Sequence, residues 1–147
     1  MSDLAAIRSG IDDFYEVISG TAGQVRDWDK MRSLFIPGAY VTICPAAGSR
    51  VRSTTTMGVE AYIENLARFL KDRDFYEMGI IRHTEIFGNI ASVISTYEAR
   101  KSSDEEEPLK RGVNFIHLCY DNDRWLITNM IWRDEDEDYP LPDKYRS

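Results

Sequence analysis

The sequence predicts an α+β fold in which three N-terminal helices pack on an antiparallel sheet. Two observations lead to this prediction. Up to Leu70, apolar residues recur mainly at steps of three and four, the spacing of one helical face. From Phe75 onward every segment is strand-like, rich in β-branched and aromatic residues. Helices and strands that are segregated in this way are typical of helices covering one face of an antiparallel sheet.

The helical part of the chain divides into three segments. The first covers Asp3–Ser19, and Ser2 or Asp3 itself can serve as its N-cap. The second covers Asp27–Phe35, with its first residue as N-cap, and Pro37 stops it. The third covers Gly58–Leu70, where the apolar residues form one broad face.

Strands occupy most of the remaining chain. Tyr40–Cys44 is a short β run, and residues 46–56 form a loop or a weak edge strand. Two longer strands cover Phe75–Phe87 and Ile90–Lys101. The segment Arg111–Arg133 reads as a hairpin, because the three polar residues in its middle tolerate turn geometry.

The strand Ile90–Arg100 carries information on assembly. Successive side chains of a strand point to opposite faces of its sheet. Neither face of this strand is wholly polar: Val93 and Tyr97 lie on one, and Ile94 lies on the other. We therefore expect the outer face of the sheet to meet a second copy of the chain in a homodimer.

The length of the chain and the position of its charges indicate how it is divided into domains. A chain of 147 residues fits one domain, which we place at residues 1–133. An acidic tail follows at residues 134–147, where Pro140 and Pro142 disfavour regular structure. The net charge of −7 comes from this tail and from Asp104–Glu107. Because the cations elsewhere are scattered without interleaved aromatic residues, we expect no binding of nucleic acid.

Several other classes of protein and site are disfavoured. The chain has no signal-peptide pattern and no apolar run long enough to span a membrane, so we expect a soluble, cytoplasmic protein with no membrane partner. Cys44 and Cys119 lie in apolar runs, without the Cys and His spacing that holds zinc. We expect neither a metal nor a cofactor.

Four segments carry a resemblance to a known superfamily: Arg26–Ala39, Phe87–Glu98, Arg111–Asn114 and Arg124–Trp132. Together with the order of helices and strands, they resemble the nuclear transport factor 2-like (NTF2-like) superfamily, also called SnoaL-like or ketosteroid-isomerase-like. The four segments look like those of a bacterial branch of that superfamily, whose members mostly lack an assigned activity. The resemblance implies a cystatin-like cone, in which a strongly curved antiparallel sheet and the helices enclose a central pocket.

That pocket leads to a prediction of small-molecule binding. The resemblance places Tyr97, Asn114 and Trp132 on strands that line the cone, where aromatic rings and an amide would hold a flat, partly polar organic ligand. We expect four further residues to contribute to this ligand-binding surface: Trp28, Tyr40, Tyr62 and Asn129.

An enzyme is the alternative: a cofactor-independent lyase, isomerase or cyclase, of the SnoaL or dehydratase type, in which His83 or Tyr15 transfers a proton. Isomerases of the superfamily use carboxylic acids in an apolar cavity, but Tyr40–Pro45 contains no acid where the base is expected. His83 shares a strand face with Glu85, and the two pair either in the pocket or on the surface. By alternation, either the face of Asn114 or that of His117 lines the cone, and the sequence leaves this choice open.

Overall fold

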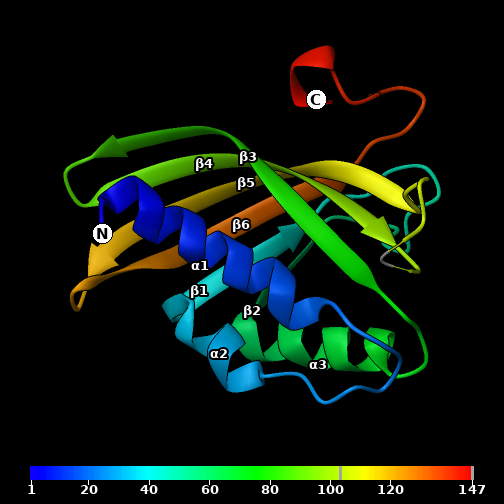
Figure 1. Ribbon diagram of the computed structural model, residues 1–147, viewed down its shortest axis with the longest axis horizontal. Coiled ribbons are helices and arrows are strands. Elements are labelled where there is room, and N and C mark those ends of the chain that lie inside the picture. The colour runs from blue at the N-terminus through cyan, green and yellow to red at the C-terminus, as the bar shows by residue number, and fades with distance from the viewer. Residues whose placement is uncertain (103, 147) are drawn as a thin grey trace.

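The computed structural model describes residues 1–102 and 104–146, and over these residues the chain forms three α-helices on one six-stranded, curved sheet (Figure 1). The helices are α1 (Asp3–Ile18), α2 (Trp28–Ser33) and α3 (Val59–Leu70). The strands are β1 (Phe35–Ile43), β2 (Thr55–Gly58), β3 (Tyr76–Phe87), β4 (Ile90–Arg100), β5 (Lys110–Asp121) and β6 (Arg124–Asp134). Their order in the sheet is β2-β1-β6-β5-β4-β3. The predicted α+β class is confirmed; β1 and β2 precede α3 in the chain, and the four long strands follow it.

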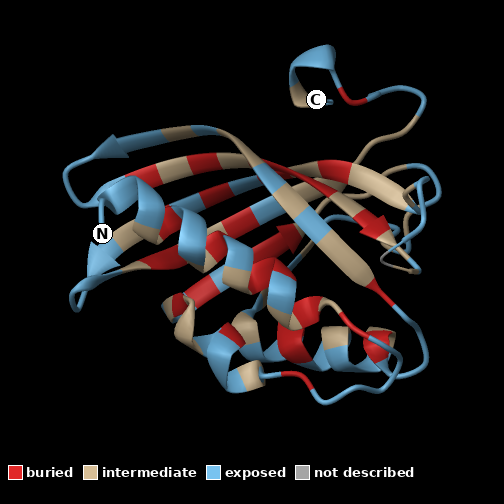
Figure 2. Ribbon diagram, in the orientation of Figure 1, coloured by how far each residue is buried: buried red, intermediate tan, exposed pale blue. Residues whose placement is uncertain are grey.

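The helices begin where their caps predict. Ser2 Oγ accepts a hydrogen bond of 3.1 Å from the backbone N–H of Ala5, and Asp27 Oδ1 accepts one of 3.0 Å from Lys30. These bonds satisfy donors that have no partner within the first turn of a helix. Helix α1 crosses the concave face of the sheet and buries the stripe predicted from its apolar spacing (Figures 1 and 2).

Strand β1 differs from the prediction. The second helix ends at Ser33, and β1 starts at Phe35 and continues through Pro37 and Gly38, where its register to β6 shifts. Pro37 lacks a backbone donor and Gly38 adopts a φ of 84°, so this pair forms an irregularity within a strand rather than a boundary. The sheet is also not wholly antiparallel, because β1 pairs with β6 in parallel.

The two long hairpins have the predicted connections. Asn122 and Asp123 adopt φ values of 53° and 64°, which tightens the turn between β5 and β6. Gly88 adopts a φ of 58° in the turn between β3 and β4. The sequence predicts either a loop or a weak edge strand for residues 46–56. The end of this segment is part of an edge strand, because β2 begins at Thr55 and pairs with β1.

The residues after β6 pack against the sheet. Leu141 is buried, and its backbone N–H donates a 2.8 Å hydrogen bond to Glu135. Arg82 donates to the carbonyl of Tyr145 and to Thr96, a residue on the β4 face opposite to α1. A short 3-10 helix (Asp143–Tyr145) therefore lies on the outer side of the sheet (Figure 1). Among the described residues, no helix is both long enough and apolar enough to cross a membrane.

Candidate functional site

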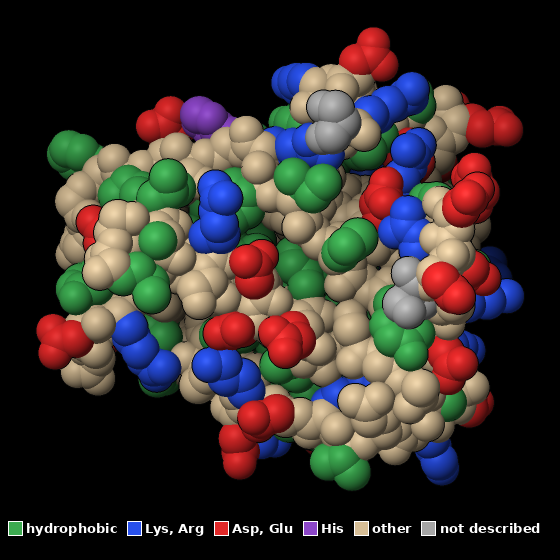
Figure 3. Space-filling view, viewed as in Figure 1, with side chains coloured by type: hydrophobic (Ala, Val, Ile, Leu, Met, Phe, Trp, Pro, Cys, Tyr) green, Lys and Arg blue, Asp and Glu red, His purple; other side chains and the backbone are tan. Residues whose placement is uncertain are grey.

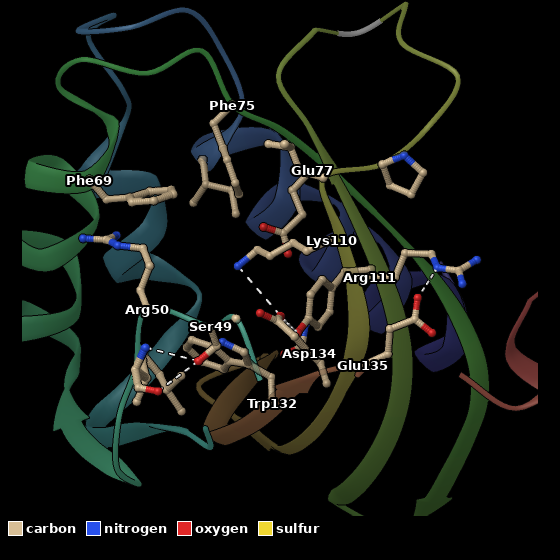
Figure 4. A pocket seen from close by; sticks show the side chains of 18 of the residues that line it. Ser49, Arg50, Phe69, Phe75, Glu77, Lys110, Arg111, Trp132, Asp134 and Glu135 are labelled. Atoms are coloured by element: carbon tan, nitrogen blue, oxygen red, sulfur yellow. Dashed lines mark hydrogen bonds and ion pairs between the residues drawn. The ribbon is translucent and has the colours of Figure 1, made fainter. Parts of the chain in front are cut away.

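A cavity of about 730 Å³ lies between helices α1 and α3 and the concave face of the sheet. Its walls are apolar and aromatic and its open end is polar (Figure 4). Loop residues 47–51 form one rim, and residues 107–109 form another. This size and this mixture of surfaces are typical of pockets that hold a small molecule. On the outer surface of the molecule, Figure 3 shows acidic and basic side chains mixed over the viewed face.

A row of four residues crosses the sheet at the cavity: Gly79 on β3, Tyr97 on β4, Gly112 on β5 and Asp134 on β6. The two glycines make room for tyrosine side chains. A Cβ added at Gly112 would lie 2.2 Å from Tyr97 Oη, and one added at Gly79 would lie 2.2 Å from the ring of Tyr15. Because Gly112 has no side chain, Tyr97 reaches over it and donates a 2.5 Å hydrogen bond to Asp134.

The next row holds a buried polar group. Ser95, Asn114 and Trp132 pair across β4, β5 and β6. Tyr15 from α1 lies above them, at 2.9 Å from Ser95 Oγ, and its hydroxyl accepts a 2.8 Å hydrogen bond from Asn114 Nδ2. Burial raises the pKa of Tyr15 above the usual range of a tyrosine, so this hydroxyl stays protonated at neutral pH.

Glu77 is a carboxyl group of the cavity whose pKa lies near neutrality. Burial raises its pKa to about 7; the charge of Lys110 opposes this shift and the charge of Asp134 adds to it. Within the described part of the chain, no group donates a hydrogen bond to its carboxylate. Lys110 Nζ lies 3.8 Å from Asp134 Oδ1, and Figure 4 shows Glu77 pointing toward this pair. A carboxyl group that titrates near neutrality can either accept or donate a proton.

Much of the remaining cavity wall is aromatic. The rings of Phe69 and Phe75 make an edge contact with centroids 5.3 Å apart, and those of Tyr62 and Trp132 lie 5.5 Å apart. Arg50 extends from the rim loop over Phe69 (Figure 4). A ligand in this cavity would thus meet both aromatic rings and two carboxylates.

Four of the residues predicted to bind a ligand line this cavity: Tyr62, Tyr97, Asn114 and Trp132. The other three do not lie on its surface as the structure describes it. Trp28 packs against the core from α2. Tyr40 and Asn129 are register partners on β1 and β6, on the face opposite to Val41 and Met130, which are buried. Alternation along β6 therefore separates Asn129 from Trp132.

The two predicted proton-transfer residues lie in different places. Tyr15 reaches the cavity through Asn114, whereas His83 is exposed on the outer face and lies 2.9 Å from Glu85. Of the two locations left open for the His83–Glu85 pair, the structure has the one on the surface, because of a β-bulge between Ile81 and His83. The extra residue reverses the alternation of β3, so Glu77 points inward but His83 points outward.

The structure also decides which face of β5 lines the cone. Asn114 is buried and faces the cavity, whereas His117 is exposed on the opposite face. Neither histidine belongs to the cavity lining among residues 1–102 and 104–146. In the same described ranges, no three His, Cys, Asp or Glu side chains gather closely enough to hold a metal ion.

The sequence reasoning missed the charged residues of the site, among them Arg50, Glu77, Lys110 and Asp134. The last of these lies in an acidic run that we assigned to the tail. The sequence did contain one signal of this site, because a glycine inside a strand indicates that another group approaches the backbone closely there. Gly79 and Gly112 mark the two strands that flank Tyr97.

The likeness of this chain to other proteins is structural. No sequence-family model matches it, and no curated protein matches it in sequence. An NTF2-like protein of unknown function from Silicibacter pomeroyi has a TM-score of 0.68 at 14% identity, over 90% of this chain and 95% of that chain. A protein of unknown function with a cystatin-like fold from Nostoc punctiforme has a TM-score of 0.67 at 10% identity, over 92% of each chain.

A third similar structure has a suggested activity. This protein from Streptomyces avermitilis is proposed to be a dehydratase of the NTF2-like family. It has a TM-score of 0.64 at 14% identity, over 91% of this chain and 96% of that chain. The three helices, the curved sheet and the likeness to these structures lead to one conclusion: this chain has the NTF2-like fold, an α+β fold of the cystatin-like kind.

Proposed function

We propose that this protein binds a small organic molecule in the cavity between α1, α3 and the sheet. The single observation that carries this proposal is the cavity itself, about 730 Å³ in volume, with aromatic walls and a polar end. The ligand would have a flat apolar body that contacts Tyr62 and Trp132, and a polar group directed toward Glu77 and Asp134.

Binding is tested with N-phenylnaphthylamine, an uncharged dye that fluoresces when it enters an apolar site. We expect saturable fluorescence with the wild-type protein and its loss in Leu66→Trp, because Leu66 lines the cavity and the larger ring would fill it. The matched control is Ala67→Trp, which places the same ring on an exposed position of α3. Absence of saturable binding, or equal binding by both variants, would contradict the proposal.

A second candidate function is proton transfer without a cofactor, as in a lyase or an isomerase. It is supported by Glu77, whose pKa of about 7 suits a general base at neutral pH. The Glu77 carboxylate would remove a proton from a carbon next to a carbonyl group. The ammonium group of Lys110 would then stabilise the negative charge that develops on the carbonyl oxygen. In this candidate Glu77 takes the role that the sequence suggested for His83.

This candidate is tested with nitrobenzisoxazole, which opens to a coloured nitrophenolate when a base removes its ring C–H proton. The rate should rise with pH with a midpoint near 7, and it should fall to the background rate in Glu77→Gln. His83→Gln serves as the comparison and should retain the full rate. Retained activity in the Glu77 variant, or its loss in the His83 variant, would exclude Glu77 as the base.

We also propose a homodimer through the outer face of the sheet. Phe115 and Ile131 pair across β5 and β6 on that face and are 47% and 39% exposed. Tyr40 on the neighbouring β1 is 47% exposed and extends the apolar area. Light scattering with size-exclusion chromatography should give twice the chain mass for the wild type and a single chain mass for Phe115→Glu. A monomeric wild type at micromolar concentration would refute the dimer.

A further inference from the structure

Two arginines converge on one aromatic ring at the Phe69 end of the cavity. The guanidinium carbon of Arg50 lies 4.3 Å from the centroid of the Phe69 ring, and that of Arg73 lies 4.5 Å from it. Arg73 is held there by a 3.3 Å hydrogen bond from Nη1 to the carbonyl oxygen of Phe69. The separation of the two guanidinium carbons therefore cannot exceed the sum of these two distances. Two positive charges thus lie close together against the ring of Phe69.

This arrangement concentrates positive charge on the cavity rim. Burial lowers the pKa of Arg50, and the charge of Arg73 lowers it further, while the charge of Asp72 acts in the opposite direction. Both arginines are exposed, so solvent screens much of the repulsion between the two cations. Asp72 and the stacking on Phe69 offset part of what remains, and an anion bound at Arg50 would offset more.

The other cations of the cavity lining have carboxylate partners. Lys110 Nζ lies 3.8 Å from Asp134 Oδ1, and Arg111 Nε donates a 2.6 Å hydrogen bond to Glu135. Arg50 also lines the cavity, yet within residues 1–102 and 104–146 it forms no ion pair with a carboxylate. Its guanidinium thus keeps donors that a ligand could use, in the planar geometry that suits an oxyanion.

Phe69, which the two arginines contact, is separated from Glu77 by about the width of one aromatic ring, that of Phe75. Phe75 contacts Phe69 edge to face, with centroids 5.3 Å apart. Phe75 precedes Glu77 by two residues on the same face of an extended segment, which corresponds to about 7 Å between their Cα atoms. A compact molecule can therefore contact the arginine end and the Glu77 end at once.

From these contacts we infer that Arg50, supported by Arg73, binds the anionic group of the ligand, and that the ligand is a compact carboxylate with an apolar ring or short chain. The carboxylate lies at the Phe69 end, the apolar body lies against Phe75 and Trp132, and the opposite polar group meets Glu77. This inference rests on the proposed function, because it assigns the chemical class of the molecule that the cavity holds.

Two dyes with the same ring system test the inference: anilinonaphthalene sulfonate, which carries a sulfonate as a stand-in for the carboxylate, and uncharged N-phenylnaphthylamine. Wild-type protein should bind the sulfonate about tenfold more tightly than the uncharged dye. Arg50→Gln should remove most of this preference, and adding Arg73→Gln should remove the rest. The control is Arg52→Gln, which neutralises an exposed arginine two residues away on the same loop and should leave the preference unchanged.

The outcomes separate the two proposals. Failure of wild-type protein to bind the uncharged dye overturns the proposed function. Equal affinity for the two dyes, or the same loss of sulfonate binding in the Arg50 and Arg52 variants, overturns the anion site and leaves the cavity as a neutral pocket. An equal loss of both dyes in the Arg50 variant also overturns it, because Arg50 would then act only by packing on Phe69.

Discussion

Tyr97 on β4 donates a 2.5 Å hydrogen bond to Asp134 on β6, across the intervening strand β5. The bond exists because the residue between them is Gly112, which pairs with both in the sheet register. A side chain at this position would occupy the path of the tyrosine hydroxyl. The open end of the cavity thus depends on one residue that contributes no side chain.

Substitution of Gly112 tests this dependence. A Cβ at that position would lie 2.2 Å from Tyr97 Oη and 2.3 Å from the carbonyl oxygen of Arg133, so Tyr97 and the backbone must shift. We expect Gly112→Ala to lower the free energy of unfolding by about 1–3 kcal/mol in urea titrations. The control is Gly10→Ala on α1, which meets nothing within 4 Å and should raise stability by about 0.5–1 kcal/mol. A Gly112 variant as stable as the control would contradict this view of the site.

The buried hydroxyl of Tyr15 permits a graded test. Tyr15→Phe removes both of its hydrogen bonds and leaves Ser95 and Asn114 without this partner, whereas Ser95→Ala removes one bond and one polar group together. Because a buried polar group without a partner costs about 1–3 kcal/mol, the Tyr15 variant should be the less stable of the two. Urea unfolding of both proteins measures the difference. The opposite order would show that Asn114 finds another partner.

Glu77 should make stability depend on pH in an unusual direction. Its pKa is about 7 in the folded chain, against an ordinary value of 4.5, so between these pH values the folded state binds more protons than the unfolded state. The stabilisation is complete below pH 4.5 and is lost as the pH rises through 7. Glu77→Gln mimics the protonated form and should gain at most about 3 kcal/mol relative to wild type between pH 4.5 and pH 8. A difference that does not change with pH would rule out the raised pKa.

Asp136 links the rim of the cavity to the residues after β6. It accepts hydrogen bonds from the backbone of Ala47, from Arg133 and from the backbone of Tyr139, and these bonds lower its pKa to about 2. Its contribution to stability is therefore present above its ordinary pKa and is lost as the pH falls toward 2.

Removal of this carboxylate should loosen the rim. We expect Asp136→Ala to speed amide hydrogen exchange in residues 47–51 relative to wild type, because Ala47 loses its acceptor. Asp138→Ala, which removes an exposed carboxylate two residues away, is the matched control and should leave that segment unchanged. Equal exchange in the two variants would mean that the rim is held by other contacts.

Local patterns along the chain sufficed for most of the fold. The three helices, the capping by Ser2 and Asp27 and the turn at Asn122 and Asp123 follow from contacts within a few residues. The start of β1 at Phe35 did not follow. There the carbonyl oxygen of Leu34 accepts a hydrogen bond from Ile127, which lies far along the chain.

The sequence by itself thus determined the class of the fold, the order of its elements and the aromatic and amide residues on the strands that enclose the cavity. The tertiary structure alone decided which ionisable groups face that cavity. A single bulge on β3 turns His83 outward and leaves Glu77 inside, and the register across β4, β5 and β6 brings Asp134 to Tyr97. Bulges and register depend on pairing between distant segments, and one inserted residue exchanges the two faces of a strand.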